Sequence, residues 1–127
     1  MDMTKKDEVD AAFHKAVDGR KIHVMVSNAA QTGPVDLVRE VDPDKFLTTV
    51  DTNLRGSLLV AQAFLRYAVL DAVVIEVRSS AAHVAFGAVF AAYSIAKLPV
   101  FQCGTCWGSP IPICACIIHN QGSSKLR

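Results

Sequence analysis

The sequence lacks the glycine-rich turn that holds the phosphates of a dinucleotide. Its seven glycines are scattered between Gly19 and Gly122, and none follows a first strand in the G-x-G-x-x-G spacing. In that spacing, backbone N–H groups and a helix N-terminus together bind a pyrophosphate. We therefore do not expect the 127 residues to hold a dinucleotide tightly by themselves.

Cysteine and charge are missing from opposite parts of the chain. Residues 1–100 contain no cysteine, whereas residues 98–124 contain no Asp, Glu, Lys or Arg and include all four cysteines. A body without cysteine suits a cytoplasmic protein. We divide the chain into residues 1–100, a partial folded domain, and residues 101–127, a Cys- and Pro-rich tail that we expect to be disordered or poorly packed.

The sequence also lacks the features that would indicate binding to nucleic acid, secretion or a membrane-spanning helix. Thirteen basic and twelve acidic residues leave a net charge of +1, which indicates neither nucleic acid nor an acidic membrane surface. The charged N-terminus has no apolar core of a secretion signal. Residues 98–118 are long enough to cross a bilayer, but Pro99, Pro110 and Pro112 would interrupt the helix that a crossing requires.

Apolar residues at helical spacing predict two long helices. The first is expected to begin after a capping box formed by Thr4 and Asp7 and to end at Gly19. The second is expected to begin at Asp42, a capping residue followed by proline, and to run to about Ala68.

Apolar runs predict strands at residues 22–26 and 72–77, and a third, shorter helix is expected at residues 91–97. This alternation predicts an α/β fold, specifically a Rossmann-like doubly wound parallel sheet. The chain is expected to hold only the central βαβα segment of such a sheet, followed by an irregular C-terminal tail.

Tyr93 and Lys97 lie four residues apart and share one face of the third predicted helix. A nearby ammonium group stabilises a phenolate, which allows a tyrosine to exchange protons near neutral pH. Taken alone, the pair also fits a half-exposed helical surface.

Four segments, taken in order, resemble those of short-chain dehydrogenases/reductases. Residues 24–30 (VMVSNAA) resemble the family's strand-to-Asn-Asn-Ala-Gly segment, residues 50–56 (VDTNLRG) its central-helix Asn segment, residues 74–80 (VIEVRSS) its serine-bearing strand, and residues 93–97 (YSIAK) its Tyr-x-x-x-Lys motif. Ser27 and Ala30 replace the family's first Asn and its Gly.

The resemblance implies hydride transfer between NAD or NADP and a small carbonyl or alcohol substrate. It makes Tyr93 the general acid/base, and Lys97 the residue that assists Tyr93 and binds the nicotinamide ribose. Ser80 would orient the substrate carbonyl, and Asn53 would hold a water of the proton relay. The resemblance implies no metal.

The same resemblance places Asn28 and Ala29 along the adenosine side of the cofactor cleft. Structural alternatives remain open for three of the polar residues. Asn53 would satisfy a buried backbone group, Ser80 would cap the turn after its strand, and Asn28 would bond at the end of the sheet.

The tail allows two further interpretations. Cys103, Cys106, Cys114 and Cys116, with His119 nearby, could bind zinc, although the second pair is spaced poorly for a structural site. Alternatively, residues from about Phe101 onward arise from a frameshift or splicing error. Shifting a permitted back-translation by two bases restores a helix-like half, a strand-like segment and a terminal Pro-Gly, as in the family.

Since the family's glycine-rich turn would precede Met1, we expect a truncated fragment with little or no activity. The alternative is a noncatalytic fragment. It would associate, through the helices that carry Asn53 and Tyr93, with a second copy or with a full-length relative.

Overall fold

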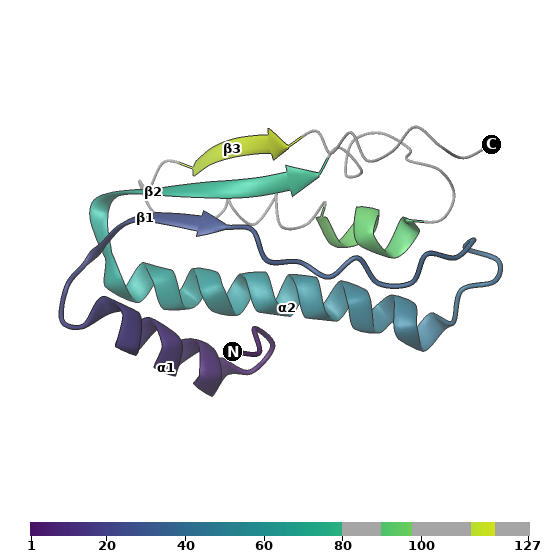
Figure 1. Cartoon of the computed structure of the whole chain (residues 1–127), viewed down its shortest axis with the longest axis horizontal. Helices are drawn as coiled ribbons and strands as arrows, with labels where there is room; N and C mark the ends of the chain where they lie inside the picture. The colour runs from purple at the N-terminus through teal and green to yellow at the C-terminus, as the bar shows by residue number, and fades with distance from the viewer. Residues whose placement is uncertain (80–89, 98–112, 119–127) are drawn as a thin grey trace.

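The structure, a computed structural model, describes residues 1–79, 90–97 and 113–118. Its elements in chain order are α1 (Lys6–Val17), β1 (Ile22–Ser27), α2 (Pro43–Tyr67), β2 (Ala68–Ser79), a short helix at residues 91–97, and β3 (Ile113–Ile118) (Figure 1). Helices and strands alternate as predicted, and the α/β class is confirmed.

Within the described residues, three strands form one parallel sheet in the order β1-β2-β3, with β2 between the other two. The connection from β1 to β2 contains α2, because two parallel strands need a crossover that returns the chain to the same edge. The sequence does not predict β3, which lies in the tail and pairs with β2 from Val74 to Ser79.

The N-terminus of α2 is capped as predicted. The Asp42 carboxylate accepts hydrogen bonds from the backbone N–H groups of Asp44 (2.9 Å) and Lys45 (3.4 Å). Pro43 occupies the first turn, where its missing N–H leaves no bond unmade. The helix then runs to Tyr67, one residue short of the predicted end.

The predicted capping box of α1 is wrong. The N-cap residue is Lys5, whose side chain makes no capping hydrogen bond. Instead, the Thr4 hydroxyl and backbone N–H both donate to the Asp2 carboxylate, which closes a turn before the helix and leaves Thr4 unable to cap it. At the C-terminus, α1 ends at Val17, and two left-handed residues follow it, the C-cap Asp18 (φ +46°) and the predicted stop residue Gly19 (φ +75°).

The core lies between the helices and one face of the sheet. Phe64, Ala72 and Val74 are buried together, and Phe13 of α1 packs against them. The α1 helix contacts α2, and α2 contacts β1. Both long helices therefore bury apolar side chains against the same cluster.

The alternation of β1 is broken where its pairing with β2 is irregular: two residue steps in β1, from Ile22 to Val24, pair with five in β2, from Ala68 to Val73. Strand alternation alone would put Ile22 on the same face as Val24 and Val26, opposite Met25. The pairing with β2 shifts between Ile22 and Val24, so Ile22 and Met25 both pack against the core. Val24 and Val26 remain 55% and 60% exposed on the other face.

Four of the five leucines of α2 lie on its exposed side. Leu47, Leu54, Leu58 and Leu65 are 62%, 36%, 47% and 37% exposed, and their spacing aligns them along one face of the helix. The buried residues of the helix include Thr49, Asn53, Gly56, Ala63 and Phe64. The predicted helix is present, but Phe64 and a set of small and polar residues, rather than these four leucines, face the interior.

Candidate active site

Tyr93 and Lys97 lie one turn apart on the short helix of residues 91–97. Ala92 and Ala96 are buried, at 2% and 0% exposure, and so anchor this helix. The Lys97 ammonium lies 5.9 Å from the centroid of the Tyr93 ring, and both side chains are half-buried. The ammonium therefore lies within cation–π distance of the Tyr93 ring.

Two opposing effects act on the Lys97 ammonium. Burial lowers the pKa of Lys97, and the negative charge of Glu76 raises it in part. Glu76 lies on β2 and is only 6% exposed. Because it alternates with Val74 and Ala72, it belongs to the face of the strand that packs on the core.

Asn53 joins α2 to the loop that follows β1. Its side-chain N–H groups donate to the backbone oxygens of Gln31 (2.8 Å) and Thr49 (2.9 Å), and its oxygen accepts from the Gln31 N–H (2.8 Å). Asn53 is 4% exposed. The structural alternative for this residue, satisfaction of buried backbone groups, is therefore observed.

The predicted cofactor-lining residues lie at the carboxyl edge of the sheet. Asn28 and Ala29 directly follow β1 and are exposed. Since Ser27 pairs with Glu76, Asn28 leaves the sheet beside the last residues of β2. In open parallel sheets, ligands bind outside this edge. Ser80, which would follow β2 there, lies outside the described residues.

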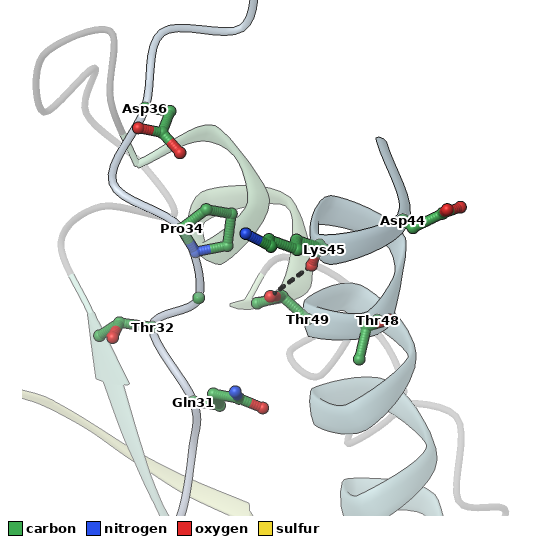
Figure 2. A pocket seen from close by; sticks show the side chains of 9 residues that line it. Gln31, Thr32, Pro34, Asp36, Asp44, Lys45, Thr48 and Thr49 are labelled. Carbon is green, nitrogen blue, oxygen red and sulfur yellow. Dashed lines mark hydrogen bonds between the residues drawn. The ribbon is translucent and has the colours of Figure 1, made fainter. Parts of the chain in front are cut away.

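A cavity of about 580 Å³ lies between the loop after β1 and the first turns of α2. Figure 2 shows Lys45 extending from α2 toward Pro34, with Thr49 between the two segments. The Thr49 hydroxyl donates to the backbone oxygen of Lys45 (2.9 Å). Gly33 closes the loop on Thr49: its φ is +73°, and a Cβ there would lie 2.3 Å from the Thr49 hydroxyl oxygen.

Sequence reasoning missed two residues of this arrangement. Gln31 takes part through its backbone, which no side-chain pattern reveals. Glu76 offered a signal, because it is a carboxylate within an apolar strand and alternates with Ala72 and Val74. That position on the strand predicts a buried acid, and buried acids need a partner.

The zinc-site and frameshift interpretations concern a tail that lies mainly outside the described residues. Cys103, Cys106 and His119 are among the residues that the structure does not describe. Within the described ranges, no cluster of three or more His, Cys, Asp or Glu residues could hold a metal ion. No helix in those same ranges is long and apolar enough to span a bilayer.

Comparisons with known proteins agree on the type of fold. A family model described as short chain dehydrogenase matches residues 1–107. A comparison with curated proteins found no match. Among solved structures, the chain resembles a short-chain dehydrogenase/reductase from Vibrio parahaemolyticus with a TM-score of 0.73 and 23% identity, over 90% of this chain and 56% of that one.

Two further structures show the same likeness. A short chain dehydrogenase/reductase from Saccharomyces cerevisiae matches with a TM-score of 0.78 and 22% identity, over 93% of this chain and 49% of that one. An NAD+-bound xylitol dehydrogenase matches with a TM-score of 0.73 and 22% identity, over 80% of this chain and 40% of that one. The chain thus spans about half the length of these structures.

Proposed function

The chain belongs to the short-chain dehydrogenase family, and from that premise we propose that its Tyr93 and Lys97 perform the proton transfer of an NAD(P)-dependent oxidoreductase. The observation that carries the proposal is the Lys97 ammonium, half-buried and 5.9 Å from the Tyr93 ring centroid. The substrates would be small carbonyl compounds or alcohols, and the site of action cytoplasmic.

Tyr93, Lys97 and Asn53 have roles that fit their positions, whereas the role of Ser80 rests on the resemblance to the family alone. The Tyr93 hydroxyl gives its proton to the carbonyl oxygen during reduction and takes it back during oxidation. Lys97 stabilises the phenolate left behind. Ser80 orients the substrate oxygen. Asn53 holds the loop after β1 in place, and its role in holding a relay water rests on the resemblance to the family alone.

The donors present fit one half of a nicotinamide dinucleotide. The Lys97 ammonium and the Tyr93 hydroxyl suit the ribose hydroxyls next to the nicotinamide, which supplies or accepts the hydride when bound. Exposed Asn28 and Ala29, at the carboxyl edge of the sheet, suit the adenosine side. The sequence supplies no glycine-rich turn for the diphosphate, so we propose weak binding and slow turnover by these 127 residues alone.

Titration of the purified chain with NADH and NADPH, followed by nicotinamide fluorescence, tests this part of the proposal. We expect nicotinamide fluorescence to rise without saturating at micromolar NADH or NADPH. Without a glycine-rich turn, the diphosphate of the cofactor would make few contacts with backbone N–H groups. Saturable micromolar binding would contradict the expected weakness.

The exposed leucines of α2 favour a second function, association with another copy of the chain. Leu47, Leu54, Leu58 and Leu65 form one apolar stripe, about 27 Å long from first to last at the helical rise per residue. Exposed leucines that share one face of a helix suit an interaction surface. A stripe on a single helix can meet its own copy across a two-fold axis, which makes it self-complementary.

Charge within the stripe should abolish this association. We expect the wild-type chain to sediment as a dimer and the double variant Leu54→Lys, Leu58→Lys to sediment as a monomer with an unchanged circular dichroism spectrum. Leu70→Lys, on β2 at a residue 85% exposed and outside the stripe, is the matched control and should remain dimeric. A monomeric wild type in analytical ultracentrifugation would rule out the stripe as a self-association surface.

A further inference from the structure

The cavity between the loop after β1 and the first turns of α2 is lined by none of the described residues that we propose for proton transfer or cofactor binding. Its walls come from residues 31–34 and 36 of the loop and from residues 44, 45, 48 and 49 of the helix. Pockets that hold small molecules have volumes of roughly 300–1,000 Å³. At about 580 Å³, this cavity is large enough for a ligand of its own.

Two contacts hold the loop wall of the cavity against the helix wall. The Asn53 side chain exchanges two hydrogen bonds, both of 2.8 Å, with the backbone of Gln31. Further along the loop, Gly33 lies so close to Thr49 that a Cβ on Gly33 would come within 2.3 Å of the Thr49 hydroxyl oxygen. Asn53 and Thr49 are 4% and 2% exposed, so both contacts are anchored in the interior. The cavity is therefore preformed, which lowers the entropic cost of binding a ligand.

An acid and a base line the cavity from opposite walls. Figure 2 shows the Lys45 side chain extending from α2 toward the loop, and Asp36 on the loop beyond Pro34. Asp44, the other acid of the lining, points away from the loop in the same view. Neither Lys45 nor Asp36 forms an ion pair with a residue that the structure describes. Both charges are therefore available to a ligand.

We propose that this cavity binds a small zwitterion, with the carboxylate of the ligand at Lys45 and its ammonium at Asp36. A ligand with a single charge would complement only one of the two walls. Gln31 and Thr48, which also line the cavity, add neutral hydrogen-bonding groups for the polar atoms between the two charges. Amino acids belong to this class of compound. The proposal does not depend on hydride transfer and can be tested without any turnover.

The test is a titration of the 15N-labelled 127-residue protein, followed by two-dimensional NMR. The probes are glycine, β-alanine and 6-aminohexanoate, which are zwitterions with increasing separation of the two charges. We expect at least one of them to shift the backbone signals of residues 31–36 and 44–49. The dissociation constant should be on the order of millimolar, because each exposed ion pair contributes little. Hexanoate and hexylammonium carry one charge each and should bind about fivefold more weakly than the best zwitterion.

Lys45→Met and Asp36→Asn each remove one charge from the cavity and should weaken the best zwitterion about fivefold. Lys21→Met and Asp71→Asn make the same changes at exposed residues that do not line the cavity, and should leave the affinity unchanged. The proposal would be overturned if no zwitterion shifts these signals, or if the single-charge probes or the cavity variants bind as tightly. The comparison of probes uses the wild type, so it decides the question whether or not a variant folds.

Discussion

Asn53→Asp is expected to lower the free energy of unfolding by roughly 3–5 kcal/mol, because buried polar groups that lose their partners cost about 1–3 kcal/mol each, and more when charged. The substitution preserves shape but turns the donating amide into a carboxylate. The backbone oxygens of Gln31 and Thr49 would then face a negatively charged oxygen instead of an N–H group. Asn53 is 4% exposed, so water cannot readily take over these bonds.

Equilibrium urea unfolding, followed by far-UV circular dichroism, measures this effect. Asn28→Asp is the matched control: it makes the same chemical change at an exposed residue, where about 0.5 kcal/mol or less is expected. A loss below about 1 kcal/mol for Asn53→Asp would contradict the account, since that is the scale of a single ordinary hydrogen bond. The loop after β1 would then be held in place by other contacts.

Tyr93→Phe is expected to reduce turnover by about 10²–10⁴-fold, the usual contribution of a general acid or base. The substitution removes the hydroxyl and leaves a ring of the same size beside the Lys97 ammonium. Helix packing through Ala92 and Ala96 is unaffected, so folding should be preserved. The loss would therefore report on proton transfer and not on stability.

The assay follows reduction of a panel of small aldehydes and ketones with NADH or NADPH in large excess, because weak cofactor binding is expected. Tyr67→Phe makes the same change at the chain's other tyrosine and should retain wild-type turnover. Equal rates for wild type and Tyr93→Phe would exclude the tyrosine from the chemistry.

The sequence predicted the end of a helix correctly where one or two neighbouring residues determine it. Asp42 and the proline after it determine the start of α2, because both act within one turn. Thr4 failed as a cap because Asp2 competes for its hydroxyl, a contact that the capping pattern does not include. The strand at residues 72–77 was found, but β2 begins at Ala68, directly where α2 ends.

Packing directions were harder to predict than elements. Leu47, Leu54, Leu58 and Leu65 resemble a buried stripe. The interior side of α2 instead carries Asn53, which bonds to Gln31 in the loop after β1 and to Thr49 in its own helix. Its partner, Gln31, is distant in sequence. The tail gave no alternation from which β3 could be predicted, because its short apolar run lies among cysteines and prolines.

The resemblance to the family was the most informative part of the sequence. It named Tyr93 and Lys97, which the structure brings together on one helix, and Asn53, which the structure buries. Glu76 has no role in the quoted motifs, although its alternation with Ala72 and Val74 is a signal of burial, and the structure buries it. The family match ends at residue 107, shortly after the point where we propose that the reading frame changes.

Deuterium transfer tests the central claim most directly. The chain is incubated with a carbonyl compound and NADPH or NADH carrying deuterium at the transferable position of the nicotinamide, and the alcohol is analysed by mass spectrometry. The account predicts one deuterium on the former carbonyl carbon for the wild type, and none above the protein-free background for Tyr93→Phe. A wild-type product without deuterium, or an equally labelled product from Tyr93→Phe, would contradict it.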